Sequence, residues 1–372
     1  MPGTICDILP TACALLGMPG TEDRLDLGSR LGEVRRVAVL LVDGMGYHLL
    51  PTMAPHAPVL ASVLRGSAGI LDELACEFPS TTPTSLVSLG TGVRPGAHGI
   101  LGFTVNVPGT QRVLTHITWR DDPKPDSWQP VPTLFERAAR AGTGAAVVLP
   151  AAFAGSGLTT AAYRGARFCG LGKREDPAAR LLTELRAGPG LVYGYDSSLD
   201  TAAHLFGIAS PQWQRAATSV DALIGRIVSG LPDDAALLVT ADHGGLDIPP
   251  AGRFDIDTDP RLGAGVQIVA GEPRVRYLHT RPGATPDVIA TWGNVLGEQA
   301  IVRSRDQLID EDWFGPVPAA HRARIGDVVV VCQGSAVVLA TAHEPDTVAK
   351  LIGFHGAVSP EETAIPLITF RD

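Results

Sequence analysis

The stretch AALLVTADHGG, residues 235–245, is an unbroken apolar run that ends in Asp242, His243 and two glycines. A short apolar run of this kind, bounded by turn residues, predicts a strand that is buried on both faces of a sheet. Asp and Gly are also ordinary turn residues, so the stretch alone is equally consistent with a plain strand and turn. Whether Asp242 and His243 carry chemistry depends on what the rest of the chain places beside them.

Further apolar runs of the same kind occur along the chain, at VRRVAVLLVD (34–43), LACEFP (74–79), GAAVVLP (144–150) and GLVYGYD (190–196). Amphipathic patterns between them predict helices at 133–142, 178–188 and 210–231. Continuous apolar strands that alternate with amphipathic helices favour a mostly parallel sheet with helices on both faces. The sequence therefore predicts an α/β fold, arranged as an α/β/α sandwich.

The residue pattern changes after residue 245, where turn residues become frequent. Apparent strands at 272–280 and 327–340 then flank a helical pattern at 285–299. This change predicts an inserted smaller α+β unit at residues 255–340. Residues 1–254 and 341–372 would form the main catalytic domain.

The composition describes a compact globular protein of 372 residues, with 45% hydrophobic and 19% charged residues. A formal net charge of −9, without a Lys/Arg run, argues against bulk nucleic acid as a ligand. The N-terminal apolar patch lacks the preceding basic residues of a signal peptide, and no run approaches the roughly 18 apolar residues of a membrane span. Five scattered cysteines fit free thiols. We expect a cytoplasmic protein without a membrane partner, and the oligomeric state stays open.

Polar side chains collect where the predicted strands end, which is where open parallel sheets bind their ligands. Asp43 ends the first run, and Asp200 and His204 stand four residues apart after the run at 190–196. Each has an ordinary reading: Asp43 as a turn residue, Asp200 and His204 as a solvated helical pair, and His355 as a turn histidine. Taken singly, none of them identifies a site.

The segment STTPT, residues 80–84, crowds hydroxyl groups at a strand-to-helix junction. Ser and Thr are preferred helix N-caps, so we expect capping to use one of these hydroxyls and to leave the others free. A free hydroxyl such as that of Thr82 would lie where the positive end of a helix attracts an anion. Such a place suits the binding and attack of a phosphate.

Together these positions supply three Asp, three His and one Thr. Oxygen and imidazole ligands without thiolate suit zinc, or less well manganese or iron, and six of them suffice for two ions with open positions. Two such metals can activate a hydroxyl nucleophile and neutralise a leaving oxygen. The set therefore predicts hydrolytic phosphoryl chemistry on a small-molecule phosphoester.

Five motifs with this order and spacing resemble the alkaline phosphatase superfamily and, within it, the nucleotide pyrophosphatase/phosphodiesterase (type I phosphodiesterase) family. The motifs are VLLVDGMG (39–46), FPSTTPTSLVSLGTGVRPGAHGILGF (78–103), YDSSLDTAAHLFG (195–207), VTADHGG (239–245) and FHGAVSPEETAIPL (354–367). The resemblance implies an alkaline-phosphatase-like sandwich with a smaller cap-like unit. It also implies a hydrolase of phosphodiester or pyrophosphate bonds.

The resemblance assigns roles residue by residue. It makes Thr82 the nucleophile that forms a phospho-threonine intermediate. It implies two divalent ions, Zn²⁺ first and Mn²⁺ as the alternative. The residues that would hold the ion beside Thr82 are Asp43, Asp242 and His243, and those that would hold the second ion are Asp200, His204 and His355.

The pattern departs from the family in two places. Where the family carries an Asn that binds a phosphoryl oxygen, the matching register has Phe103, with Asn106 three residues later as the candidate replacement. Pro83 follows Thr82, where an aromatic residue is common. Substrate preference is therefore open, and a phosphomonoesterase or phosphomutase of the same superfamily, or a catalytically silent binding protein with this fold, stays as an alternative.

Overall fold

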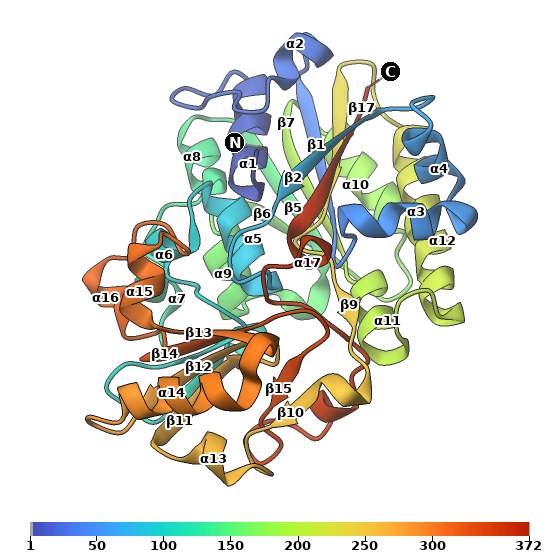
Figure 1. Ribbon diagram of the computed structural model, residues 1–372. Helices are drawn as coiled ribbons and strands as arrows, with labels where there is room; N and C mark the ends of the chain where they lie inside the picture. Colours follow the sequence, from blue (N-terminus) through green and yellow to red (C-terminus); the bar gives the residue numbers. More distant parts are fainter. Residues whose placement is uncertain (1–2, 372) are drawn as a thin grey trace.

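The computed structural model describes residues 3–371, so Met1, Pro2 and Asp372 of the predicted catalytic range lie outside the described residues. Its central sheet has seven strands in the order β2-β17-β8-β1-β7-β5-β6 (Figure 1). The neighbours from β8 to β6 run parallel, whereas β17 is antiparallel to β8 and to β2. In that order the strands span Ile70–Ala75, Ala364–Phe370, Ala235–Thr240, Arg36–Val42, Gly190–Asp196, Gly144–Pro150 and Arg167–Leu171.

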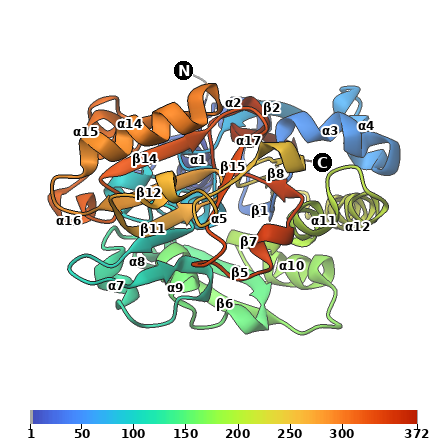
Figure 2. The same cartoon turned by 60° about the horizontal axis from the view of Figure 1, so that its bottom comes forward.

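Helices cover both faces of this sheet, which confirms the predicted α/β/α sandwich (Figures 1 and 2). One face carries α1 (Ile5–Leu15), α5 (Thr82–Thr91), α8 (Leu134–Arg140) and α9 (Gly157–Tyr163). The other carries α3 (Leu50–Met53), α4 (Pro58–Leu64), α10 (Pro177–Arg186) and α12 (Pro211–Val228). The helical patterns at 133–142, 178–188 and 210–231 correspond to α8, α10 and α12.

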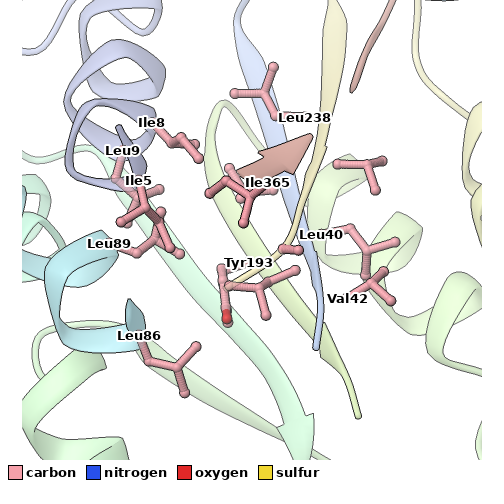
Figure 3. Close-up of a cluster of buried hydrophobic side chains, with 14 of the residues drawn as sticks. Ile5, Ile8, Leu9, Leu40, Val42, Leu86, Leu89, Tyr193, Leu238 and Ile365 are labelled. Atoms are coloured by element: carbon pink, nitrogen blue, oxygen red, sulfur yellow. The ribbon is translucent and has the colours of Figure 1, made fainter. Parts of the chain in front are cut away.

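The main core covers both faces of the sheet, and Figure 3 shows the part of it near α1 and α5. Burial of these side chains supplies the main favourable term for folding. It also fixes α5, and with it Thr82, against the central strands. The side chains drawn and labelled there come from α1 (Ile5, Ile8, Leu9), α5 (Leu86, Leu89) and the sheet (Leu40, Val42, Tyr193, Leu238, Ile365).

A second, antiparallel sheet lies beyond the carboxyl ends of the parallel strands (Figure 1). One of its faces joins the main core through residues such as Tyr277, while Leu278 on the opposite face packs with Trp292 of α14. The sheet order is β11-β12-β14-β13, with bounds Val266–Glu272, Val275–Thr280, Val328–Cys332 and Ala300–Ser304, and α14 spans Thr285–Leu296.

Shorter elements complete the described chain. The helices among them are α2 (Leu27–Leu31), α6 (Pro95–His98), α7 (Pro125–Trp128), α11 (Ser198–Phe206), α13 (Pro260–Gly263), α15 (Arg305–Asp310), α16 (Ala319–Arg322) and α17 (Pro360–Thr363). The strands are β3 (Thr104–Asn106), β4 (Val113–Thr115), β9 (Leu246–Asp247), β10 (Arg253–Asp255), β15 (Val337–Leu339) and β16 (Gly353–Phe354).

The strand predicted at 74–79 is wrong in its position, because β2 occupies Ile70–Ala75 instead. This is an edge strand with partly or fully exposed Asp72 and Glu73, so it lacks the continuous apolar pattern of the parallel strands. The chain leaves the sheet after Ala75, and Pro79 has no N–H to contribute to a strand pair. Residues 76–80 instead lead into α5.

Two expectations about the whole chain concern cysteines and membranes. All five cysteines are buried and free. Within residues 3–371, the structure contains no helix that combines the length and the apolar character needed to cross a membrane.

Candidate active site

Asp43 and Asp242 meet because they lie just beyond the ends of neighbouring parallel strands, β1 and β8, whose residues pair in register up to Leu41 and Thr240. The turn after Asp43 uses Gly44 at φ 72°, and its N–H donates to Oδ1 of Asp242 over 3.1 Å. A Cβ on Gly44 would lie 2.9 Å from the Cβ of Asp200. The glycine in this motif thus lets the chain bend and lets Asp200 approach.

His243 completes a first cluster. Its Nε2 lies 3.5 Å from Oδ1 of Asp43 and 3.4 Å from Oδ2 of Asp242. Both carboxylate oxygens are buried and have no hydrogen-bond partner among the described residues. Nδ1 of His243 lies 2.8 Å from the carbonyl oxygen of Gly244, which can only accept, so the neutral ring presents an unprotonated Nε2 to the carboxylates. Two unpaired oxygens and a nitrogen lone pair that converge in this way fit a bound cation.

Asp200, His204 and His355 form a second cluster beside the first. The first two lie on α11, and His355 follows β16. The Nε2 of His204 is 3.2 Å from Oδ2 of Asp200 and 3.2 Å from Nε2 of His355. Nδ1 of each histidine faces a carbonyl, that of Gly353 for His204 at 2.8 Å and that of Ser80 for His355 at 2.9 Å. When both rings are neutral, these contacts leave the two Nε2 atoms unprotonated and facing each other, which fits a cation between them.

The structure therefore gathers all six predicted ligand candidates in one place. Asp43, Asp242 and His243 form one group, as the family resemblance implies, with ligand atoms within 4.8 Å of one another. A second group with the same spacing contains Asp200, His355 and again His243, where the sequence led us to expect His204. His243 adjoins both groups because its ring stacks on that of His355 at 3.5 Å between centroids.

The electrostatic interactions among these side chains also favour a bound cation. Burial, followed by the charges of Asp242 and Asp200, raises the pKa of Asp43, and burial also raises the pKa of Asp242. At Asp200 burial is outweighed by the charge of His204, and the pKa is lowered. The same interaction raises the pKa of His204 to about 9, against the effect of burial. A cation would stabilise the ionised carboxylates that this burial disfavours.

Thr82 lies at the first position of α5 and faces this cluster, with Oγ1 3.1 Å from Nε2 of His243. Ser85, one turn later, donates to the carbonyl oxygen of Asp242 over 2.8 Å and ties the helix to the end of β8. The nucleophile candidate and the first cluster are thus held on one rigid frame of helix and strand.

The expectation that one hydroxyl of STTPT caps the helix is wrong. Thr81 is the N-cap residue, yet its side chain makes no capping hydrogen bond, and its Oγ1 is buried without a partner. Ser80 instead donates to the carbonyl oxygen of Ala357 over 2.7 Å. The loop that carries His355 therefore takes the hydroxyl that could have capped α5.

A buried ion pair also holds the loop that carries His355. Glu362 accepts from Nε and Nη2 of Arg274 over 2.9 and 2.6 Å, and both side chains are fully buried. Glu362 also accepts from the N–H of Ala357 over 2.9 Å. Bidentate Arg–carboxylate pairing fixes geometry as well as adding energy. It connects the loop of His355 to the second sheet.

A cavity of about 760 Å³ opens from the second cluster, with His204 and His355 in its wall. Phe103 lines this cavity, whereas Asn106 is not among its lining residues and has a buried Oδ1 without a partner. The structure therefore brings Phe103 to the site opening and leaves Asn106 away from it.

Two further side chains at the site were missed by the sequence reasoning. The hydroxyl of Tyr195 donates to Oδ2 of Asp43, and Glu272 lines the cavity beside His355. Tyr195 lies within the motif YDSSLD at a strand end, a position that could have drawn attention to it. Glu272 lies in no recognised motif.

Replacing Tyr195 with phenylalanine should weaken metal binding by about 10- to 100-fold, since groups that orient a ligand carry effects of this size. Without the hydroxyl, Oδ2 of Asp43 loses its donor and Oδ1 is less firmly directed at the cation. Calorimetric titration of the metal-free protein with Zn²⁺ measures the change. Tyr193→Phe is the matched control, because its hydroxyl accepts from Tyr163 rather than donating to a carboxylate. Equal affinities in Tyr195→Phe and wild type would contradict this role.

Comparison with known proteins places this geometry in context. The sequence model of the type I phosphodiesterase / nucleotide pyrophosphatase family matches residues 37–358. A search of curated proteins finds no match.

Solved structures share the fold. Murine ectonucleotide pyrophosphatase/phosphodiesterase 5 superposes with a TM-score of 0.71 at 16% identity, covering 91% of this chain and 88% of that one. An inactive threonine-to-alanine variant of the murine protein, in complex with AMP, superposes with a TM-score of 0.71 at 16% identity, covering 90% of this chain and 87% of that one. Phosphonoacetate hydrolase from Sinorhizobium meliloti 1021, in complex with phosphonoacetate, superposes with a TM-score of 0.68 at 19% identity, covering 91% of this chain and 90% of that one. Because the family match spans most of the chain, we conclude that this protein belongs to the type I phosphodiesterase / nucleotide pyrophosphatase family of phosphoester hydrolases.

Proposed function

We propose that the protein is a metal-dependent phosphodiesterase that acts through a covalent intermediate on Thr82. The observation that carries the proposal is the position of Oγ1 of Thr82, 3.1 Å from Nε2 of His243 and beside two buried carboxylate oxygens without partners. A hydroxyl so placed, at the positive end of a helix, can approach a bound phosphoryl group. That a threonine-to-alanine variant of the murine neighbour is inactive supports a threonine nucleophile here.

The six ligand candidates would hold two divalent ions, with Zn²⁺ as the first choice and Mn²⁺ as the second, because the donors are oxygen and imidazole nitrogen without thiolate. Asp43, Asp242 and His243 would hold the ion beside Thr82. Asp200, His204 and His355 would hold the other, with His243 close to both. When bound, such ions supply positive charge that lowers the pKa of a hydroxyl and stabilises a leaving oxygen.

The residues of the chain then perform two displacements. In the first, Oγ1 of Thr82 forms a bond to phosphorus, and the bond from phosphorus to the leaving oxygen breaks. In the second, water attacks the phosphorus, the bond to Oγ1 breaks, and the second product leaves. Ser85 keeps Thr82 in place through its hydrogen bond to the backbone of Asp242.

The charge of the cavity favours a diester over a monoester. A monoester carries an additional negative charge, which a phosphatase or phosphomutase would neutralise with free cationic groups. Among the described residues that line the cavity, Arg276 is the one Lys or Arg, and it is already bound to Glu344. A phosphodiester, with one negative charge, suits this lining better. The complete set of ligand candidates also argues against a catalytically silent binding protein.

The proposal is tested by comparing bis(p-nitrophenyl) phosphate with p-nitrophenyl phosphate as substrates of protein reconstituted with Zn²⁺ or Mn²⁺. We expect kcat/KM for the diester to exceed that for the monoester by at least about 100-fold, since an unmatched charge in such a site costs several kcal/mol. A preference for the monoester would assign the protein to the phosphomonoesterases. Absence of hydrolysis of either ester by metal-loaded protein would support a silent binding protein.

A further inference from the structure

The carboxyl group of Glu272 has no assigned task in the chemistry described above. Glu272 ends β11 and forms part of the cavity wall together with His204 and His355. The residue is 5% exposed, and its Oε1 is buried with no hydrogen-bond partner among the described residues. Buried polar atoms are normally paired, so an unpaired carboxylate oxygen in a cavity wall calls for a ligand.

Glu272 also lies close to the loop that carries His355 and to the start of α5. A Cβ on Gly356, the residue after His355, would lie 2.9 Å from Cδ of Glu272, so the glycine makes room for the carboxyl group. Burial raises the pKa of Glu272 to about 8, and the nearby hydroxyl of Thr81 offsets part of that rise. Thr81 directly precedes Thr82. A substrate bound at Thr82 would therefore bring one of its ester arms within reach of this carboxyl group.

No Lys or Arg side chain among the described residues of the cavity wall is free to occupy this position. Arg276 donates to Glu344 over 2.5 and 2.8 Å and to the carbonyl oxygen of Val338 over 2.7 Å, so all three nitrogens of its guanidinium group are engaged. Among the described lining residues, Asp257 adds another carboxylate. The cavity therefore offers hydrogen-bond acceptors and negative charge rather than a binding place for a second phosphate.

The remaining wall is largely apolar. Val113 lies on β4 and Ile117 follows that strand, while Val266 and Ile268 lie on β11. Apolar walls suit a short carbon chain on the substrate. A hydrogen-bond donor at the far end of that chain would reach the carboxyl group of Glu272.

We propose that Glu272 selects phosphodiesters in which one ester arm carries a primary ammonium group on a short carbon chain. The inference rests on the proposed phosphodiesterase function and names its substrate class. The ammonium group donates to Oε1 of Glu272, and its positive charge favours the ionised form of a carboxyl group that burial disfavours. An anionic arm, such as a further phosphate, is disfavoured because it would face Glu272 and Asp257.

The test uses three p-nitrophenyl phosphodiesters that differ only in the second arm: 2-aminoethyl, ethyl and 2-carboxyethyl. All share one leaving group, so differences in kcat/KM report on recognition of the arm. For wild-type protein we expect the 2-aminoethyl ester to exceed the ethyl ester by about tenfold or more, because a site with a buried acceptor rejects an analogue that lacks the donor. The 2-carboxyethyl ester should be the poorest of the three.

Glu272→Gln should lower the ratio of the 2-aminoethyl to the ethyl ester by about tenfold, since the amide keeps the shape and loses the charge. Glu298→Gln is the matched control: it removes one exposed carboxylate that does not line the cavity, and it should keep the wild-type ratio. Glu272→Asp keeps the charge and should retain part of the preference. It also serves as the second variant if Glu272→Gln fails to fold.

Equal kcat/KM values for the three esters in wild-type protein would overturn the proposal, as would a ratio unchanged by both substitutions at Glu272. Either result leaves the phosphodiesterase function standing, because the ethyl ester would still be hydrolysed. Failure of that function is recognised separately, by the absence of p-nitrophenol release from every ester by protein that contains its metals.

Discussion

Thr82→Ala is expected to lower turnover of bis(p-nitrophenyl) phosphate by at least about 1,000-fold, since loss of a covalent nucleophile closes the two-step route. The substitution removes only Oγ1 and a methyl group. The ligand candidates and their hydrogen bonds to backbone carbonyls stay in place, so metal content and melting temperature should change little. Steady-state kinetics with metal analysis of the same samples separate loss of chemistry from loss of structure.

Two neighbouring substitutions act as controls for this prediction. Thr82→Ser keeps the hydroxyl but loses the β-methyl that restricts its rotamer, so it should retain measurable activity. Thr81→Ala removes a hydroxyl that makes no capping hydrogen bond, and it should keep most of the turnover. The assignment of the nucleophile fails if Thr82→Ala remains near the wild-type rate, or if Thr81→Ala is the variant that abolishes turnover.

Removal of the divalent ions by a chelator is expected to abolish turnover and to lower the melting temperature. Without its ions the site would hold the carboxylates of Asp43, Asp242 and Asp200 close together, and Oδ1 of Asp43 and Oδ2 of Asp242 are buried with no partner among the described residues. A ligand that binds only the folded state stabilises it by mass action, so the loss grows with the affinity for the metal. Addition of Zn²⁺ should restore both the rate and the melting temperature.

The pKa values of the site residues also predict how the stability of chelated protein depends on pH. The folded-state pKa values of Asp43 and Asp242 are raised, so the folded state binds more protons than the unfolded state at pH values above the unfolded pKa. Stability therefore falls as pH rises from about 4 through the raised pKa values. The raised pKa of His204 adds stability below the unfolded pKa of about 6.5, which is lost as pH rises through about 9.

The difference in melting temperature between metal-loaded and chelated protein should therefore shrink as pH is lowered from 8 to about 5, because bound ions require ionised carboxylates and neutral imidazoles. Buried histidines with lowered pKa values elsewhere in the fold affect both samples alike. Full activity in the presence of a strong chelator, with no metal found by elemental analysis, would contradict the metal site.

The sequence predicts the sheet and most of the site for a physical reason. Strands that are buried on both faces must be apolar throughout, so β1, β5, β7 and β8 are visible as runs, and the polar residue that ends a run marks the functional edge of the sheet. Asp43 and Asp242 are visible in this way. Asp200 and His204 are visible because their four-residue spacing places them on one side of a helix.

The features that the sequence did not reveal depend on contacts between distant segments. Glu272 is adjacent in space to Gly356, but 84 residues separate them in the printed sequence and no local pattern connects them. The hydroxyl of Ser80, next to the N-cap residue Thr81, donates to the carbonyl oxygen of Ala357, which is 277 positions away in the sequence. The edge strand β2 is hidden because its exposed polar residues resemble a loop. Local patterns report burial, whereas these features arise from tertiary packing.

The central claim is that hydrolysis proceeds by two displacements through Thr82, and the configuration at phosphorus tests it most directly. A diester made chiral at phosphorus by sulfur and oxygen isotopes would be hydrolysed by the metal-loaded protein, and the configuration of the product determined. Each displacement inverts the phosphorus centre, so attack by Thr82 followed by attack by water predicts overall retention. Inversion would show that water attacks the substrate directly, and it would contradict the covalent intermediate.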